Sequence, residues 1–271
     1  MTTSEWIVAT EYIFRQADIT TARLDALVLL GDMLGRDKAW VLAHPEYELQ
    51  RSELKSLHKK IAQRIQHIPL AYIRGKVEFY GREFVVNEHV LVPRPESESM
   101  ITLLVASTKH HSEITIIDIG TGSGALAITS KLELPNSTVL ATDIDPACLE
   151  VAKQNALKLS ANITFLRADL LAHIPNSKFI MQNSIILANL PYVPDAYPIN
   201  RAAAHEPRSA LYGGADGLDY YRALFVQAKE HQVKCIITES LLEQHSSLAT
   251  IAQGTGYSLT TTDGLAQLYS T

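Results

Sequence analysis

Apolar side chains recur at helical spacing over residues 1–70 of the chain. Three segments carry the pattern, at residues 6–14, 22–34 and 49–68, and charged residues fill many of the positions between them. Gly35 directly follows the second segment, and a glycine at that place commonly ends a helix. The pattern therefore predicts a small bundle of helices. No catalytic residue is evident there, so packing and partner binding are both open as its role.

A shorter period of apolar residues follows over residues 71–92. Residues 78–86 predict two strands about a glycine-centred turn, a hairpin that would link two domains. Beyond it, two prolines bracket Arg94 and stiffen its backbone. Glu96 lies near the start of the next predicted helix, at residues 99–107, where a carboxylate stabilises the helix terminus. The same charged turn is also suited to form the wall of an active site.

From residue 93 to residue 271, short runs of β-branched residues alternate with helical patterns. This alternation predicts a parallel sheet with helices on its faces, an α/β fold. The predicted strands cover residues 114–119, 138–142, 162–168, 184–187 and 234–238, the helices 125–131, 219–229 and 241–251, and a terminal hairpin 257–262 and 266–269. A long irregular stretch follows the fourth strand, and such loops in compact domains are usually functional or disordered.

Directly after the first of these strands, glycines alternate with small polar residues in the loop Gly120, Thr121, Gly122, Ser123 and Gly124. Glycines at a strand-to-helix turn let the backbone approach a ligand and present its N–H groups. Asp143 follows the second strand, 19 residues beyond Gly124 (143 − 124), where a nucleoside-binding acid contacts a ribose. A turn with a helix cap explains Asp145 better than Asp143. The loop and the acid together predict a nucleoside-binding site.

The ends of the third and fourth strands carry further groups suited to a ligand. Asp169 could accept a hydrogen bond from an exocyclic amine, and Leu170 could cover a purine face. The carboxamide oxygen of Asn189 and a neighbouring backbone carbonyl could each accept one hydrogen of a planar NH2 group. Pro191 fixes the backbone there, and Tyr192 offers a flat face with a polar tip. A strand followed by a proline turn is the competing explanation, but the convergence of four strand ends favours a ligand site.

Composition narrows the class of protein. The 271-residue chain is 46% apolar, which is typical of a globular protein with one large or two unequal domains. Its net charge of −5 argues against a broadly basic nucleic-acid-binding surface. Two cysteines, Cys148 and Cys235, suggest no disulfide framework and fit a reducing compartment. With no basic leader and no long apolar run, we expect a cytoplasmic monomer that does not associate with membranes.

The residues at these strand ends resemble those of a known family. Asp118 through Gly124 is similar to the first motif of class I S-adenosylmethionine-dependent methyltransferases. Further segments resemble the HemK/PrmC-type protein-(glutamine-N5) methyltransferases, which act on peptide chain release factors. These segments are Tyr72-Ile73-Arg74-Gly75 with Glu78-Phe79, Val92-Pro93-Arg94-Pro95-Glu96, Asn189-Leu190-Pro191-Tyr192, and Glu206-Pro207 through Ala210-Leu211 to Gly213-Gly214-Ala215-Asp216-Gly217-Leu218.

The resemblance implies a helical domain at residues 1–70 that docks a release factor, a linker hairpin at 71–92, and a methyltransferase domain at 93–271. That domain would be Rossmann-like with a seven-stranded sheet, use S-adenosylmethionine and hold no metal. The implied cofactor contacts are Gly120, Thr121, Gly122, Ser123, Gly124 and Asp143 for methionine and ribose, Asp169 and Leu170 for adenine, and Asn189. The implied substrate contacts are Asn189, Leu190, Pro191, Tyr192, Arg94 and Glu96, of which Asn189, Pro191 and Tyr192 are the catalytic residues.

The expected mechanism follows from the poor nucleophilicity of an amide nitrogen, whose lone pair is delocalised into the carbonyl. We assign no general base to His205 or Glu206. Instead, Asn189 and the backbone carbonyl after it would hold both N–H groups and aim the nitrogen at the methyl group. Most of the rate would then come from positioning.

The chain departs from the family pattern at several places. Leu190 stands where the family usually has proline, Leu170 where an aromatic is common, and Ser97 where threonine is usual. The tail at residues 263–267 lacks the usual Asp-Arg pair. Asn-Leu-Pro-Tyr is also found in ribosomal RNA adenine dimethyltransferases, so an N6-adenine methyltransferase acting on RNA or DNA is one alternative. The acidic balance of the chain disfavours it. An inactive S-adenosylmethionine-binding paralogue is the other alternative.

Overall fold

The computed structural model describes residues 1–108, 114–172, 174 and 184–271. The chain forms two compact units, of which one comprises Met1–Lys76 with Ile199–His205 and the other Val77–Pro198 with Glu206–Thr271. The long stretch after the fourth predicted strand is thus divided, because part of it packs with the first unit. Within the described ranges, no helix is long and apolar enough to cross a membrane.

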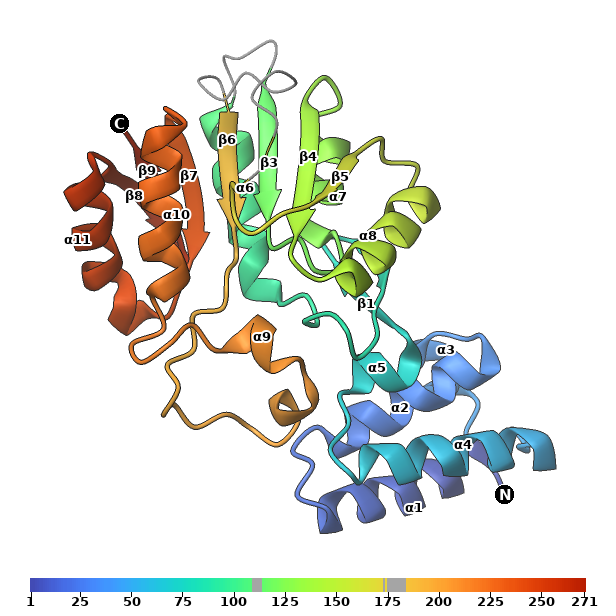
Figure 1. Cartoon of the computed structure of the whole chain (residues 1–271). Coiled ribbons are helices and arrows are strands. Elements are labelled where there is room, and N and C mark those ends of the chain that lie inside the picture. Colours follow the sequence, from blue (N-terminus) through green and yellow to red (C-terminus); the bar gives the residue numbers. More distant parts are fainter. Residues whose placement is uncertain (109–113, 173, 175–183) are drawn as a thin grey trace. The chain divides into compact units, whose positions relative to one another are not determined.

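The first unit is a bundle of helices, in agreement with the helical spacing of its apolar residues (Figure 1). α2 ends at Gly35, which adopts a left-handed conformation with a φ of 62°. The core of the unit lies around Trp6, Phe14 and Leu57. The helices are α1 (Thr3–Gln16), α2 (Ala22–Leu34), α3 (Lys38–Ala43), α4 (Arg51–Arg64) and α5 (Leu70–Arg74).

Three elements of this unit differ from the prediction, and one of them is α5, a five-residue helix at the start of the segment predicted as a linker hairpin. α4 stops at Arg64 instead of continuing to residue 68, because the chain turns at His67, whose φ of 62° is left-handed. α3 is absent from the prediction, since its six residues are too few to establish a period. The carboxylate of Asp37 defines the start of α3 by accepting a hydrogen bond from the Trp40 N–H at 2.7 Å.

The second unit contains a seven-stranded sheet, which confirms the predicted Rossmann-like fold. The strands run in the order β5-β4-β3-β6-β7-β9-β8. β3 to β7 pair in parallel, whereas β9 is antiparallel to both β7 and β8. The strands are β3 (Thr115–Ile119), β4 (Thr138–Asp143), β5 (Thr164–Arg167), β6 (Ser184–Ala188), β7 (Cys235–Glu239), β8 (Ser258–Asp263) and β9 (Ala266–Ser270).

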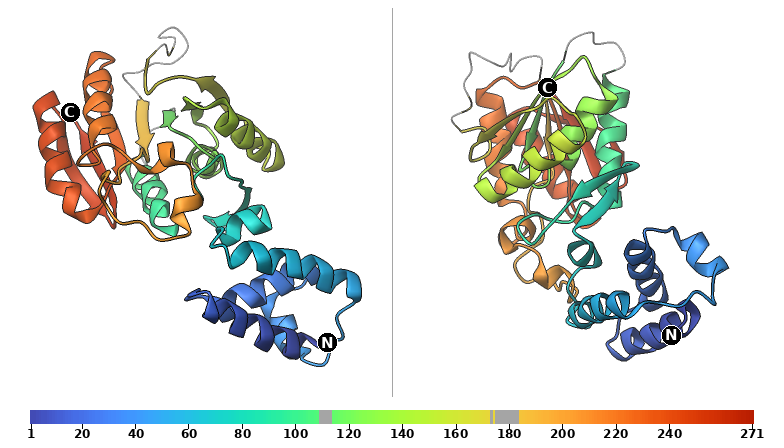
Figure 2. Two further views of the ribbon diagram at one scale, coloured as in Figure 1. Left: turned by 60° about the horizontal axis from the view of Figure 1, so that its bottom comes forward. Right: turned by 90° about the vertical axis from the view of Figure 1, so that its right-hand side faces the viewer.

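Helices cover both faces of this sheet (Figure 1, Figure 2). α6 and α7 pack with Ile116 in one core, and α10 and α11 pack with Ile117 in the other. Both faces of the strands are apolar because a covered parallel sheet is buried on each side. The helices are α6 (Glu98–Ser107), α7 (Ala125–Glu133), α8 (Pro146–Lys158), α9 (Arg208–Leu211), α10 (Asp219–Glu230) and α11 (His245–Thr255), with short 3₁₀ turns η1 (Pro95–Ser97), η3 (Ala203–His205) and η4 (Leu242–Gln244).

The predicted hairpin is present as β1 (Lys76–Phe79) and β2 (Arg82–Val85). A buried asparagine of α8, Asn155, connects it to the glycine-rich loop. The Asn155 side chain accepts from the Val85 N–H at 2.7 Å and donates to the Val85 and Ser123 carbonyls, both at 2.9 Å. The hairpin therefore packs as part of the second unit and supports the loop after β3.

The order of the strands locates the most favourable place for a ligand. From β3 the chain proceeds outward through β4 to β5, and from β6 it proceeds the other way to β7. Open α/β sheets bind ligands at the carboxyl ends of the strands where the order reverses in this way. The glycine-rich loop follows β3 and Asn189 follows β6, so both lie at this switch point.

Candidate active site

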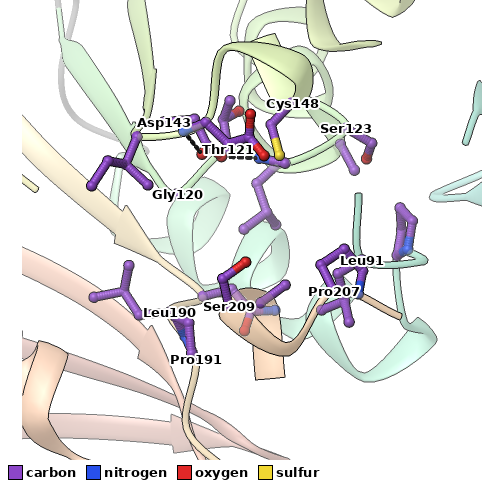
Figure 3. A pocket seen from close by; sticks show the side chains of 18 of the residues that line it. Leu91, Gly120, Thr121, Ser123, Asp143, Cys148, Leu190, Pro191, Pro207 and Ser209 are labelled. Carbon is purple, nitrogen blue, oxygen red and sulfur yellow. Dashed lines mark hydrogen bonds between the residues drawn. The ribbon is translucent and has the colours of Figure 1, made fainter. Parts of the chain in front are cut away.

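A pocket lies at the carboxyl ends of β3, β4 and β6 (Figure 3). Figure 3 shows Gly120 and Thr121 on one side of it and Pro191 and Ser209 on the other. Of the residues assigned from the sequence, the pocket is lined by Arg94, Gly120, Thr121, Gly122, Ser123, Asp143, Asp169, Leu170, Asn189, Leu190 and Pro191. Gly124, Tyr192 and Glu96 do not line it. Segments far apart in the sequence thus meet at one cavity.

The glycine-rich loop is held from beneath by Asp118, the buried fourth residue of β3. One Asp118 carboxylate oxygen accepts from the Thr121 hydroxyl at 2.6 Å and from the Ala127 N–H at 3.1 Å. Burial raises the pKa of Asp118 to about 7, against the effect of these hydrogen bonds. Gly120 and Gly122 have φ values of 69° and 55°, a region that glycine adopts without strain. The loop backbone can therefore line the pocket.

Gly124 is needed for packing between helices rather than for the pocket. Its φ is 81°, and a Cβ added there would lie 3.0 Å from Ile128 Cδ1 and 3.1 Å from Ala152 Cβ. Any side chain would separate α7 from α8. This is the close approach that the last glycine of a dinucleotide-binding loop also serves.

Asp143 ends β4 and faces the pocket while holding the glycine-rich loop. Its Oδ2 accepts from the Gly122 N–H and its Oδ1 from the Asp145 N–H, both at 2.9 Å. Burial raises the pKa of Asp143, and the two backbone hydrogen bonds oppose this rise. Each carboxylate oxygen has a second lone pair available for a ligand hydroxyl. Asp145 instead caps α8 by accepting from the Ala147 N–H at 2.8 Å, as predicted.

Asp169 and Leu170 follow β5 and contribute opposite properties to the lining. The Asp169 side chain is exposed, whereas Leu170 is buried and belongs to the apolar core. Leu170 has a φ of 51°, a left-handed conformation that costs a leucine free energy. An apolar wall beside an accessible carboxylate is thereby maintained at this end of the pocket.

Asn189 is held in one orientation by two acceptors on the NH2 side of its carboxamide, of which Ser97 also lines the pocket and Glu239 does not. Its Nδ2 donates to the Ser97 hydroxyl at 2.9 Å and to Glu239 Oε1 at 3.2 Å. Both amide hydrogens are therefore used, and a flipped amide would direct its oxygen at a carboxylate. Among the described residues no hydrogen bond engages Asn189 Oδ1. The oxygen is available as an acceptor at a residue that lines the pocket.

Tyr192 is anchored away from the pocket lining. Its hydroxyl donates to Glu239 Oε1 at 3.0 Å, and its backbone carbonyl accepts from Gln244 Nε2 at 2.8 Å. Burial raises the pKa of Tyr192, as does the nearby Glu239 carboxylate. Glu96 is exposed within η1. Neither Tyr192 nor Glu96 forms part of the pocket surface. Tyr192 is connected to the site by its hydrogen bond to Glu239, and Glu96 contributes only its charge nearby.

Arg94 forms one wall of the pocket and an ion pair behind it. Its Nη2 donates to both carboxylate oxygens of Glu206, at 2.8 and 2.7 Å. The Glu206 side chain is buried, and burial raises its pKa while Arg94 lowers it. The pair fastens the segment before α9 to the segment before α6. Arg94 therefore has a structural task besides any contact with a substrate.

Leu190, the departure from the family pattern, is explained by its surroundings. Its N–H donates to the buried hydroxyl of Tyr221 at 3.2 Å, a bond that proline could not make. The Tyr221 hydroxyl in turn donates to the backbone carbonyl of Glu239. The Leu190 side chain is buried against Gly120, where an added Cβ would lie 3.2 Å from Leu190 Cδ2. Tyr221 thereby connects the end of β6 to the end of β7.

We expect Tyr221→Phe to lower the free energy of unfolding by about 1–3 kcal/mol, the cost of leaving buried partners of a hydroxyl unsatisfied. Tyr220→Phe is the matched control, because that neighbouring ring is more exposed and no hydrogen bond of its hydroxyl is found among the described residues. Urea denaturation of both variants measures the difference. Equal stability of the two variants would contradict the role given to the Tyr221 hydroxyl.

Glu239 and Tyr221 are parts of the site that the sequence reasoning missed. Glu239 is the last residue of β7, at the same edge of the sheet as Asn189. The rule that located Asp143 and Asn189, a polar side chain closing an apolar strand, applies to Glu239 as well. Tyr221 lies within a helix and carries no such signal.

The chain is similar in sequence to known families and to single proteins. The profile of the PrmC N-terminal domain matches residues 5–75, and that of ribosomal protein L11 methyltransferase (PrmA) matches residues 99–192. A release factor glutamine methyltransferase from Koribacter versatilis is 38% identical over 219 residues, which cover 79% of this chain and 77% of the relative. One of the same name from Coxiella burnetii is 33% identical over 240 residues, covering 88% and 85%.

A comparison of structures agrees on the fold. The hMettl16 catalytic domain, solved in complex with the MAT2A 3′UTR hairpin 6, superposes with a TM-score of 0.54. The alignment covers 81% of each chain at 14% sequence identity. At that identity the likeness concerns the fold alone.

Proposed function

The chain belongs to the family of release factor glutamine methyltransferases, and we propose that it methylates the side-chain amide nitrogen (N5) of the glutamine in the Gly-Gly-Gln motif of peptide chain release factors. The methyl donor in this proposal is S-adenosylmethionine. The proposal includes action in the cytoplasm, as a monomer and without direct contact to nucleic acid.

The observation that carries the proposal is the orientation of Asn189. Ser97 and Glu239 accept both of its amide hydrogens, so Oδ1 remains free to accept from a ligand. A glutamine side chain ends in a planar NH2 group whose hydrogens need two acceptors in fixed positions. Asn189 Oδ1 would supply the first of them.

A backbone carbonyl of the same motif would supply the second acceptor. Pro191 C=O is covered by Gly213, since a Cβ there would lie 2.2 Å from the carbonyl oxygen. Tyr192 C=O already accepts from Gln244. The carbonyl of Leu190 is the best candidate, because its contact with the Tyr221 hydroxyl is long, at 3.5 Å, and leaves a lone pair for a ligand. The Leu190 backbone is positioned by the same hydroxyl, which accepts from its N–H.

These two acceptors account for the chemistry without a general base. The amide nitrogen is a poor nucleophile because its lone pair is delocalised. Holding both N–H groups fixes the nitrogen in a reactive orientation and stabilises the positive charge that grows on it during transfer. The proton leaves to water after the methyl group has been bound.

The pocket also suits S-adenosylmethionine, which when bound supplies an electrophilic methyl group on a sulfonium. The left-handed Gly120 and Gly122 leave no side chain over the loop backbone, so its groups can contact the methionine part. Asp143 would accept from the ribose hydroxyls. Asp169 and Leu170 would hold the adenine between an acceptor and an apolar wall.

An N6-adenine methyltransferase would use the same pair of acceptors, because adenine also presents a planar NH2 group. A transfer assay with labelled methyl donor separates the two substrates. We expect label to enter a release factor and not a structured RNA or DNA duplex, and entry into the nucleic acid alone would overturn the proposal. Label in neither substrate would favour the inactive paralogue.

We further propose that the first unit docks the release factor. A specific protein complex usually buries about 1,200–2,000 Å² in total, more than one glutamine can supply. On α1, Val8 and Tyr12 are 62% and 65% exposed and lie one turn apart on the same side of the helix. Exposed apolar side chains grouped in this way commonly mark a protein interface.

The double variant Val8→Ser, Tyr12→Ser tests this docking role. We expect kcat/KM on an intact release factor to fall by about 10-fold, the usual loss from removing an aromatic interface residue. Activity on a short Gly-Gly-Gln peptide should not change. Leu157→Ser, on α8 and 83% exposed, is the control. An equal loss on both substrates would show that these side chains serve folding instead.

A further inference from the structure

Glu239 is a buried carboxylate that does not itself line the pocket but contacts Asn189, which does. Its side chain closes β7, and the residue is 1% exposed. We propose that Glu239 is a positioning residue for methyl transfer, which orients the carboxamide of Asn189 toward the pocket and places a negative charge behind it. The inference rests on the proposed function and adds to it a residue that acts through another.

The pairing register of β6 and β7 brings Asn189 and Glu239 together. Ala188, the last residue of β6, pairs with Thr238 of β7. The residues that follow them, Asn189 and Glu239, are therefore neighbours at the edge of the sheet. Glu239 Oε1 lies 3.2 Å from Asn189 Nδ2. The sheet itself therefore sets the distance between the two side chains.

Glu239 has the hydrogen-bonding capacity to hold several groups at once. Its Oε1 also accepts from the Tyr192 hydroxyl at 3.0 Å. A hydrogen bond from Ser97 adds to these, and Ser97 is the other acceptor of Asn189. Its backbone carbonyl accepts from Tyr221, which holds the Leu190 N–H. One residue thus connects to both proposed acceptors of the substrate amide.

Packing does not explain a carboxylate at this position. Glu239 Oε2 is buried and has no hydrogen-bond partner among the described residues. An unsatisfied buried oxygen of this kind destabilises the fold and calls for an explanation. Burial accordingly raises the pKa of Glu239, while hydrogen bonds from Ser97, Tyr192 and Asn189 lower it. Donors from Tyr192 and Asn189 nevertheless converge on this carboxyl group, which is consistent with a functional use.

That use is electrostatic as well as geometric. A carboxylate on the N–H side of Asn189 polarises the amide and strengthens Oδ1 as an acceptor, because linked hydrogen bonds reinforce one another. The substrate nitrogen gains positive charge as it binds the methyl group, and that charge is stabilised through Asn189. Glu239 itself takes no proton from the substrate in this scheme, since it does not line the pocket.

Steady-state kinetics on Glu239→Gln and Glu239→Ala test the proposal. We expect Glu239→Ala to lower kcat by about 10²-fold and Glu239→Gln by about 10-fold, because glutamine keeps an acceptor oxygen but loses the charge. KM for S-adenosylmethionine should change little in either variant. Glu243→Gln is the matched control, an exposed glutamate four residues further on. Wild-type kcat in Glu239→Gln and Glu239→Ala would overturn the inference.

A double variant separates positioning from general support of the fold. If Glu239 acts through Asn189, adding Glu239→Ala to Asn189→Ala should lower kcat by less than about 3-fold further. If the residue only supports the fold, the two losses should multiply. Multiplication of the losses would contradict the proposal. Should Glu239→Ala fail to fold, the same comparison is made with Glu239→Gln.

Hydrogen exchange of the Asn189 side-chain amide gives a readout that needs no activity. In the free protein, NMR should find these two hydrogens protected, and Glu239→Gln should raise their exchange rate relative to Glu243→Gln. An unchanged rate would show that Glu239 does not hold the amide. A wild-type protein that fails to methylate glutamine would overturn the proposed function. The exchange measurement would still show whether Glu239 holds the Asn189 amide.

Discussion

Asn189→Ala is expected to lower turnover by about 10²-fold or more, the scale of losing one preorganised polar contact in an active site. The variant removes the Oδ1 acceptor while leaving the glycine-rich loop in place. It also releases Ser97 and Glu239, which hold the amide from the far side. Since the glycine-rich loop and Asp143 are unchanged in this variant, binding of S-adenosylmethionine should persist.

Single-turnover kinetics and calorimetry with S-adenosylmethionine measure the two effects separately. Asn136→Ala is the matched control, because that exposed asparagine precedes β4 at the opposite end of the sheet from the pocket. Turnover of Asn189→Ala close to that of the control would refute the central role of this side chain. A loss of cofactor affinity as large as the loss of turnover would indicate a collapsed pocket instead.

The second large effect is expected for Asp143→Ala, which should weaken S-adenosylmethionine binding by about 10- to 100-fold. A charge-assisted hydrogen bond contributes about 1.5–3 kcal/mol, and this variant would lose such a bond to the ribose. The variant also loses the hydrogen bond that the Gly122 N–H donates to Asp143 Oδ2, so the glycine-rich loop loses a restraint. Both changes act on the same bound ligand.

Asp145→Ala provides the control for Asp143→Ala, two residues away. Asp145 accepts from Ala147 and caps α8, so its loss should cost roughly 1 kcal/mol of stability and little affinity. Isothermal titration of both variants with S-adenosylmethionine decides between the two acids. Equal affinities would contradict the assignment of the ribose to Asp143.

The sequence predicted the parts of the fold that depend on local pattern. The alternation of apolar strands and helices was sufficient for the sheet, and the spacing from Gly124 to Asp143 identified two strand ends that meet at the pocket. Short or irregular elements could not be predicted from such a pattern. α3 has too few residues for a period, and the end of α4 depends on the left-handed backbone of His67.

The supporting contacts of the site could not be predicted because they join residues distant in the sequence. Asn189 is held by Ser97 and Glu239, which lie 92 and 50 positions away. Arg94 pairs with Glu206 across 112 positions. No pattern along the chain indicates which of many polar residues will meet in this way. The polar residue that ends each strand is the feature that a sequence does reveal.

Leu190 illustrates how a departure from a motif is understood only in three dimensions. From the sequence it opened the alternative of an adenine methyltransferase. In the structure its N–H donates to Tyr221 and its side chain packs against Gly120. These contacts concern the backbone and the core, so the substitution changes how the motif is supported rather than which acceptors it presents.

Locating the transferred methyl group by mass spectrometry tests the central claim most directly. Purified protein is incubated with isotopically labelled S-adenosylmethionine and an intact release factor, and the digested product is sequenced. The account predicts a single labelled methyl group on the side-chain nitrogen of the glutamine in Gly-Gly-Gln, and none when that glutamine is replaced by alanine. Label at any other residue, or none in the unaltered release factor, would contradict it.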